Sequence, residues 1–182
     1  MILHLVRHGQ SVWNLERRLQ GQTLHVPLTD EGLTQARRVA AELAGRRITT
    51  IWSSDQVRAR QTADEIAAVA GIPVQESVAL REQGLGSLEG VSYDDLHEQP
   101  VPEGQHISEV RWGGGESVAD VHARLIEFVA QLPDAGSDDE VVVVSHGDTL
   151  RILLAVLAGR GHREVEWLEF GNGEHRTVEV AR

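Results

Sequence analysis

The chain of 182 residues contains no cysteine. Disulfide bonds, thiolate nucleophiles and cysteine-ligated zinc sites are therefore excluded. It also lacks an apolar run long enough to cross a membrane, and its apolar start, residues 2–6, is too short for a signal peptide. We therefore expect a cytoplasmic protein that does not associate with membranes. The length favours a single domain over residues 1–182.

Positive charge is scarce relative to negative charge. Seventeen basic residues face 28 acidic ones, which gives a formal net charge of -11. No basic cluster offsets this balance, so we do not expect nucleic acid as a partner. An anionic small molecule would need a locally positive pocket. The sequence carries no signal for a particular oligomeric state.

Short apolar runs alternate with segments of helical periodicity. Strands are predicted over residues 2–6, 48–52 and 140–145, and two closing strands over 164–170 and 176–181. Helices are predicted between Thr29 and Gly45, from Ala59 to Gly71, from Ser117 to Pro133 and from Leu150 to Leu157. The unbroken valine run at 141–144 is typical of a strand covered on both faces. This pattern predicts a three-layer α/β/α sandwich with a mostly parallel central sheet.

Residues 83–116 differ from the rest of the chain. They are rich in glycine, proline, glutamate and histidine, and their periodicity is weak. We expect mostly loop there, with one short helix near residues 92–98. Long loops in compact domains are usually functional, so this segment is predicted to shape a substrate pocket.

Polar residues of one chemical kind follow three of the predicted strands. They are Arg7-His8-Gly9, then Ser53-Ser54 with Arg58 just beyond, and Ser145-His146-Gly147. The carboxyl ends of parallel strands meet at one edge of a sheet, where ligands bind and helix N-termini offer amides to anions. Arginine suits phosphate oxygens, and imidazole can act as a neutral nucleophile near neutral pH. One histidine at a strand end is usually a hydrogen-bonded turn residue, but the repetition predicts a phosphoryl pocket.

Three other signals are discounted. Gly84, Gly86 and Gly90 have the wrong spacing for a dinucleotide-binding loop, and no predicted strand precedes them. The nine histidines include no His-Glu-x-x-His pattern. No Gly-x-Ser-x-Gly motif is present either, so Ser145 beside His146 does not indicate a serine hydrolase. We expect neither a metal site nor any other cofactor.

A series of short motifs occurs in order along nearly the whole chain. They are residues 5–14 (LVRHGQSVWN), 20–21 (QG), 27–32 (PLTDEG), 53–63 (SSDQVRARQTA), 80–82 (LRE), 88–90 (LEG), 115–117 (GES) and 144–147 (VSHG). In these motifs the chain resembles the histidine phosphatase superfamily, in the branch that looks like phosphoglycerate mutases and their phosphatase relatives.

The resemblance implies a role for each matching residue. His8 would attack phosphorus, Arg7, Arg58 and His146 would hold the phosphoryl oxygens, and Glu82 would serve as proton donor and then as base. Substrate-binding positions would be Asn14, Gln20, Ser11 and Gly147. Neighbouring guanidinium groups should lower the pKa of His8, and a desolvated site should raise that of Glu82.

Three functions remain open. The first is a phosphomonoesterase that hydrolyses a small phosphorylated metabolite through a phosphohistidine. The second is a mutase, which resembles it at each catalytic residue but typically has a longer segment between the acid and the second histidine. The third is a non-catalytic phosphate-binding or regulatory protein, since fold alone does not fix function. The short 83–116 segment and the complete set of catalytic motifs favour the phosphatase.

Overall fold

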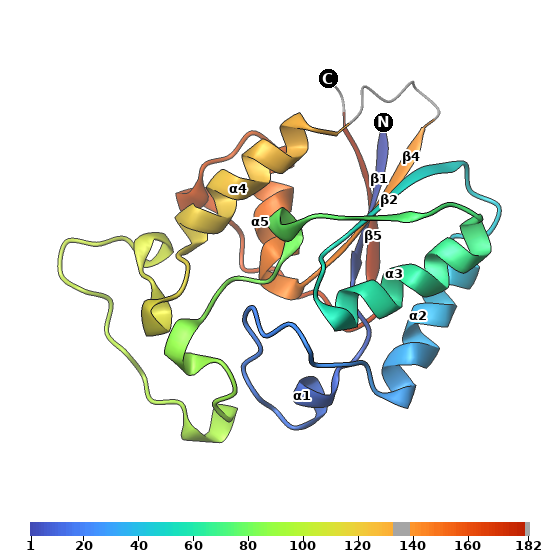
Figure 1. Ribbon diagram of the computed structural model, residues 1–182. Coiled ribbons are helices and arrows are strands. Elements are labelled where there is room, and N and C mark those ends of the chain that lie inside the picture. Colours follow the sequence, from blue (N-terminus) through green and yellow to red (C-terminus); the bar gives the residue numbers. More distant parts are fainter. Residues whose placement is uncertain (133–138, 181–182) are drawn as a thin grey trace.

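The computed structural model describes residues 1–132 and 139–180. A five-stranded sheet with the order β3-β2-β4-β1-β5 forms its centre (Figure 1). The strands are β1 (Ile2–Arg7), β2 (Ile48–Ser53), β3 (Val74–Glu76), β4 (Glu140–Ser145) and β5 (His175–Glu179). Four of them run parallel, whereas β5 pairs with β1 in the antiparallel direction. The predicted mostly parallel sheet is confirmed.

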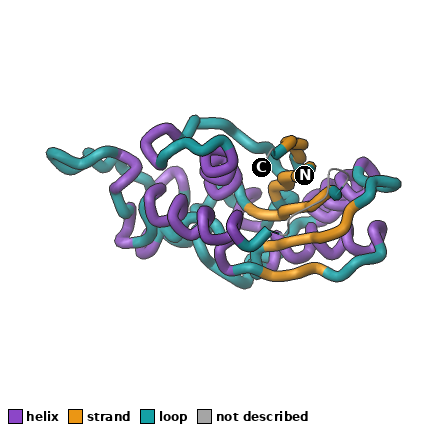
Figure 2. Tube along the Cα trace, turned by 90° about the horizontal axis from the view of Figure 1, so that it is seen from above, coloured by secondary structure: helices purple, strands orange, loops and turns teal. Residues whose placement is uncertain are grey.

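Helices cover both faces of this sheet, which confirms the three-layer sandwich (Figures 1 and 2). The helices are α1 (Val12–Leu15), α2 (Asp30–Glu42), α3 (Val57–Ala70), α4 (Val118–Ala130) and α5 (Gly147–Leu157). On one face α2 and α3 pack with Val142 and Val144, and on the other α4 and α5 pack with Val141 and Val143. All six residues of β4 are buried, as expected for a strand whose two faces both meet helices.

Local sequence signals determine where several helices begin and end. Thr29 accepts a hydrogen bond from the Gly32 amide at the start of α2, and Ser117 forms a capping box at the start of α4. Gly71 ends α3 with a φ of 73°, a left-handed conformation that glycine adopts without steric cost. These helix assignments agree with the prediction. Pro133 and Ala181, the expected ends of one helix and one strand, lie outside the described residues.

The predicted strand over residues 164–170 is wrong. The segment instead forms a 3₁₀ turn at His162–Glu164 and then continues without regular structure. Its Phe170 is buried, and the Phe170 carbonyl accepts a hydrogen bond from the Arg7 guanidinium. Packing of the Phe170 side chain, and not pairing with another strand, therefore fixes this segment. The sequence prediction also missed β3 and α1, which are too short to show a period.

Residues 83–116 are mostly loop, as predicted, with several short 3₁₀ turns. One of these turns, Tyr93–Asp95, falls within the expected short helix at 92–98. The two ends of the segment lie against each other, because a Cβ on Gly86 would lie 2.2 Å from the Gly113 carbonyl oxygen. Only glycine allows this approach. The middle of the segment extends away from the body of the protein (Figures 1 and 2).

Candidate active site

A cavity of about 300 Å³, here called the polar cavity, opens at the carboxyl ends of β1 and β4. The parallel register pairs Arg7 with Ser145, and the His8 amide donates to the Ser145 carbonyl at 3.0 Å. Most of the predicted site residues line this cavity, namely Arg7, His8, Asn14, Gln20, Arg58, Glu82 and Gly147. Two others, His146 and Ser11, are fully buried and do not line it. The expected convergence of strand ends therefore occurs.

The His8 side chain is oriented by its own backbone. Its Nδ1 lies 2.6 Å from the Gly9 carbonyl oxygen, which can only accept a hydrogen bond. Nδ1 therefore carries the proton, and Nε2 keeps a free lone pair. Burial, and then the charges of Arg58 and Arg7, hold the pKa of His8 well below its usual value of 6.5. The sequence predicted this direction from the two arginines alone, whereas burial is the larger cause.

Two arginines place positive charge beside His8. Arg58, on α3, is fully buried and donates to the carbonyls of Thr23 at 2.8 Å and Gly21 at 3.0 Å. Burial lowers the pKa of Arg58 to about 10, so it remains protonated at neutral pH. Arg7 is held through Phe170. The Nε atoms of both arginines are buried and have no hydrogen-bond partner among the described residues.

His146 caps the N-terminus of α5 and faces His8. Their ring centroids are 5.0 Å apart with the planes at 61°. Burial is the main cause that holds the pKa of His146 well below 6.5, followed by the charge of Arg58. Neither ring nitrogen of His146 has a partner within the described part of the chain. Unpaired buried donors and acceptors are rare in folded proteins, so a polar ligand is expected to complete this site.

Glu82 lies against the first turn of α5. Its Oε1 accepts from the Thr149 amide at 3.1 Å, while its own backbone amide is held by Gln56 Oε1 at 2.8 Å. Burial, and then the nearby charge of Asp148, raise the pKa of Glu82 above its usual value. The raised pKa is the direction that a proton donor needs.

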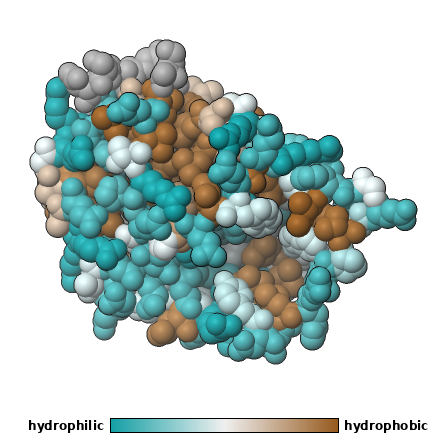
Figure 3. Space-filling model, turned by 180° about the vertical axis from the view of Figure 1, so that it is seen from behind, coloured by the Kyte–Doolittle hydropathy of each residue, from teal (hydrophilic) through white to brown (hydrophobic). Residues whose placement is uncertain are grey.

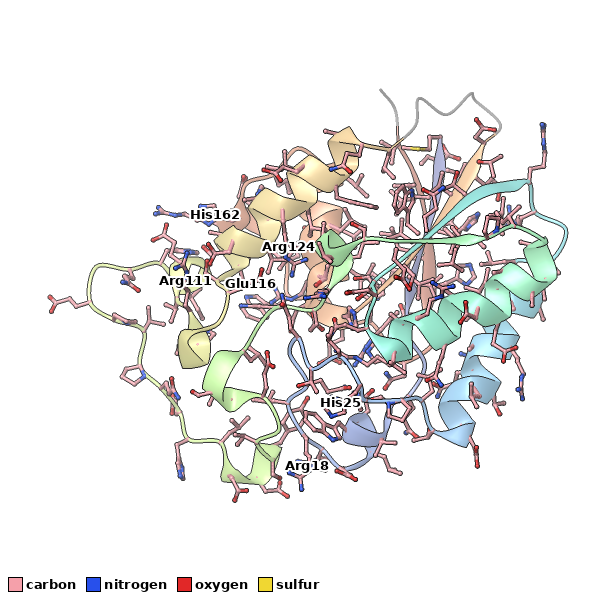
Figure 4. The ribbon with its side chains drawn as sticks, viewed as in Figure 1. Arg18, His25, Arg111, Glu116, Arg124 and His162 are labelled. Carbon is pink, nitrogen blue, oxygen red and sulfur yellow. The ribbon has the colours of Figure 1, made fainter. Side chains whose placement is uncertain are left out.

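The backbone of Glu82 is clamped from α4. Arg124 donates to the carbonyls of Arg81 at 2.8 Å and Glu82 at 3.2 Å, and it pairs with Glu116 at 3.0 Å. Glu116 in turn accepts from the Gly84 amide at 2.9 Å. Arg124 and Glu116 lie side by side next to this segment (Figure 4). These contacts tie Gly84 and Glu116, at the two ends of the 83–116 segment, to the backbone of Glu82, whose side chain lines the polar cavity.

Ser11 contacts the side-chain amides of Asn14 and Gln20. Its hydroxyl lies 2.7 Å from Gln20 Oε1, its backbone amide donates to Asn14 Oδ1 at 3.0 Å, and the residue does not line the cavity. Both amide oxygens are thus occupied, which leaves the NH₂ groups of Asn14 and Gln20 as the donors available to a ligand. The structure therefore places Ser11 as a support for the other two residues and not at the cavity surface.

Sequence reasoning missed several residues that build this site. Asn172 Nδ2 donates to Asn14 Oδ1 at 3.2 Å, and Thr62 Oγ1 accepts from the Gly9 amide at 3.1 Å. Residues 168–170 also line the cavity. Asn172 lies between two glycines, in the gap between the two closing strands that the sequence predicts. A polar side chain between two glycines is the local signal that could have identified it.

Among the residues that the structure describes, no three histidine, aspartate or glutamate side chains gather as they would around a metal ion. Across the same residues, no helix combines the length and apolar character needed to span a membrane.

Known proteins are similar to this chain over most of its length. A model of the histidine phosphatase superfamily (branch 1) matches residues 3–182. Phosphoglycerate mutase-like protein 4 of Arabidopsis thaliana is 36% identical over 156 residues, which cover 82% of this chain and 67% of that protein.

Two solved structures are also similar. The structure of a mycobacterial glucosyl-3-phosphoglycerate phosphatase in complex with VO3 has a TM-score of 0.83 and 31% identity, and the match covers 98% of this chain and 90% of that one. A phosphoserine phosphatase mutant from Entamoeba histolytica in complex with phosphoserine has a TM-score of 0.78 and 26% identity, with 97% and 89% covered.

Proposed function

This chain belongs to the histidine phosphatase superfamily, and on that basis we propose that it hydrolyses a small phosphorylated metabolite through a phosphohistidine on His8. The superfamily relatives include both phosphatases and mutase-like proteins. The reaction class is therefore argued from the polar cavity itself.

One observation carries the proposal. Arg7 Nε, Arg58 Nε and both nitrogens of the His146 ring are buried beside His8 without partners among the described residues. Buried donors without acceptors cost free energy, and a phosphoryl group brings several acceptor oxygens that are negatively charged. A phosphoryl group bound among these donors would pair them and would lie in front of the free Nε2 of His8.

The first step forms the phosphoenzyme. His8 Nε2 attacks phosphorus, and the bond from phosphorus to the ester oxygen breaks. Glu82, whose protonated form is favoured because burial raises its pKa, gives its proton to that oxygen, and the alcohol leaves. Arg7, Arg58 and His146 stabilise the charge on the equatorial oxygens during the transfer.

The second step returns the enzyme to its starting state. Glu82, now ionised, takes a proton from a water molecule, whose oxygen attacks phosphorus. The bond between nitrogen and phosphorus breaks, inorganic phosphate leaves, and His8 is again neutral. No step needs a metal ion, because the two arginines already supply the positive charge.

We further propose that residues 83–116 shape the substrate-binding region of one domain formed by residues 1–182. Leu85 and Tyr93 of this segment line the polar cavity. A mutase needs a long-lived phosphoenzyme, protected from water by additional lid structure. Tyr93 is 45% exposed, which supports a site that water can enter and hence hydrolysis.

The test compares the two reactions directly. The protein is incubated with 3-phosphoglycerate plus catalytic 2,3-bisphosphoglycerate, and separately with a panel of phosphomonoesters, while 2-phosphoglycerate and free phosphate are measured. We expect phosphate release from at least one monoester, unaffected by EDTA, and little interconversion of phosphoglycerates. Rapid interconversion with little release from any monoester would favour the mutase, and phosphate binding without either reaction would favour the non-catalytic alternative.

A further inference from the structure

A second cavity of about 220 Å³, here called the apolar cavity, lies directly beside the polar cavity. Leu19, Leu85 and Asp148 line both of them, so the two spaces are adjacent. Small molecules bind in cavities of roughly 300 to 1,000 Å³, and the two spaces together fall in that range. A ligand whose phosphoryl group lies in the polar cavity can therefore extend into the apolar cavity.

Large apolar side chains line the second cavity. Trp112 and Ile107 come from the 83–116 segment, and Val165 and Trp167 come from the segment that follows α5. Trp167 is 71% exposed and Ile107 is 43% exposed. The surface is hollowed here, and hydrophobic residues gather within the hollow and at its edge (Figure 3). Exposed apolar surface around a concavity is a common mark of a binding site.

The two arginines that line the apolar cavity are already paired. Arg151 donates to Asp148 at 2.7 Å, and its guanidinium stacks 4.1 Å from the centre of the Trp167 ring. Arg163 pairs with Glu109 at 2.6 Å. An anionic group that entered this space would meet arginines whose charge is already balanced by carboxylates. The polar cavity is the opposite, since its arginines keep unpaired Nε atoms.

The wall of the apolar cavity is held in place by a polar cluster. Ser108 Oγ lies 2.7 Å from His106 Nδ1 and 2.8 Å from His162 Nδ1. This contact joins the 3₁₀ turn at Ile107–Glu109 to the one at His162–Glu164, and the pairing of Arg163 with Glu109 joins them again. The apolar surface is therefore formed in advance and does not need a ligand to assemble it.

From these observations we propose that the alcohol part of the substrate is uncharged and apolar, and that it binds in the apolar cavity against Trp112 and Trp167. The proposal rests on the proposed phosphatase function. It names the class of substrate as phosphomonoesters of uncharged apolar or aromatic alcohols. Phosphomonoesters whose alcohol carries a second anionic group, such as a carboxylate, are disfavoured because no unpaired arginine awaits that group.

The test compares substrates that differ only in the remote part of the alcohol. 2-(1-Naphthyl)ethyl phosphate, ethyl phosphate and 3-carboxypropyl phosphate are all esters of primary alcohols, so differences in leaving-group chemistry stay small. We expect kcat/KM for the naphthylethyl ester to exceed that for the carboxypropyl ester by about tenfold or more, which is within the range that apolar contacts supply. Equal values, or a preference for the carboxylate, would overturn the proposal.

Two variants test whether the preference for the naphthylethyl ester depends on the apolar cavity. Ile107→Asp introduces a charge at the exposed edge of the apolar cavity, and it should lower the ratio of kcat/KM for the naphthylethyl ester to that for ethyl phosphate by about tenfold. Ile126→Asp is the matched control, because Ile126 is 50% exposed on α4 and lines neither cavity. It should leave both the ratio and the activity unchanged. An unchanged ratio in Ile107→Asp would contradict the proposal.

A binding experiment separates this inference from the proposed function. Calorimetric titration with 2-(1-naphthyl)ethylphosphonate and 3-carboxypropylphosphonate requires no turnover. We expect the naphthyl compound to bind the wild-type protein about tenfold more tightly, and the preference to be reduced in Ile107→Asp. If no ester is hydrolysed but the preference is found, the phosphatase proposal fails and the apolar site stands. If esters are hydrolysed and the preference is absent, the phosphatase proposal stands and the apolar-site proposal fails.

Discussion

The two neighbouring cavities differ in the kind of structural element that supplies their side chains. Most of the groups proposed for chemistry follow strand ends or begin helices, and Arg58 and His146 among them are fully buried. The apolar cavity takes most of its side chains from 3₁₀ turns and irregular segments, and several of them are exposed. A rigid scaffold thus holds the groups proposed for chemistry, and loops hold those proposed for selection. The comparison predicts that changes in the polar cavity affect every substrate, whereas changes in the apolar cavity alter preference.

The largest effect is expected at His8. His8→Asn removes the proposed nucleophile and should reduce kcat by about 10³-fold or more for every phosphomonoester, whatever its alcohol. The fold should persist, because His8 follows β1 and lies outside both apolar core clusters. Steady-state rates on the naphthylethyl and ethyl esters, with circular dichroism as the control for folding, provide the measurement. Activity close to wild type would remove His8 from its proposed role.

Loss of one arginine should cost less. Arg58→Ala is expected to lower kcat/KM by about 10²-fold, as when one preorganised charge-stabilising donor is removed. The variant also leaves the carbonyls of Gly21 and Thr23 without their donor, so its stability should be measured by denaturant unfolding. Arg58→Lys keeps the charge but loses the bidentate geometry, and it should recover only part of the rate. A folded Arg58→Ala protein with less than tenfold loss would contradict direct contact with the phosphoryl group.

The Glu82→Gln variant tests the proton donor. It should lose about 10²-fold or more in kcat/KM, which reports phosphoenzyme formation, on ethyl phosphate but far less on p-nitrophenyl phosphate, whose leaving group needs no proton. An equal loss on both substrates would argue for a structural effect.

The pH dependence of kcat/KM of the wild-type protein also tests Glu82 as the proton donor. The pKa of His8 lies well below 6.5, so the neutral nucleophile persists on the acid side, and kcat/KM should fall only well below pH 6.5. The pKa of Glu82 is raised, so the protonated acid persists above the usual carboxyl range, and kcat/KM falls as pH rises through that raised value. On p-nitrophenyl phosphate, whose leaving group needs no proton, this second fall should be absent. Persistence of the fall would assign it to another group.

A smaller effect is expected at Thr149, which contacts Glu82. Its hydroxyl lies 2.8 Å from the Arg81 carbonyl and 3.1 Å from Glu82 Oε1, and it is placed to donate to either oxygen. A donor to the carboxyl oxygen favours the ionised form, so Thr149→Val should shift the alkaline fall in kcat/KM to higher pH and reduce the rate by about two- to tenfold, the scale of one hydrogen bond. An unchanged profile would show that Thr149 does not position the acid.

The sequence predicted the scaffold and the polar cavity better than the apolar one. Apolar periodicity revealed each long helix and the buried strand β4, and the strand-end motifs brought His8, Arg58 and His146 together as expected. The paired residues Arg163 and Glu109 carry no local signal, because their contact joins two 3₁₀ turns that are far apart in the sequence. The strand wrongly predicted at 164–170 has the same cause, since tertiary contacts of Phe170 override its local pattern.

The phosphohistidine itself is the most direct test of the account. The protein is mixed with a radiolabelled phosphomonoester, quenched with alkali within a single turnover, and the labelled peptide is identified by mass spectrometry. We predict a covalent phosphate on His8 that is stable in alkali and lost in acid, present in wild type and absent in His8→Asn. Labelled phosphate on His146 or on a serine, or full labelling of His8→Asn, would contradict the central claim.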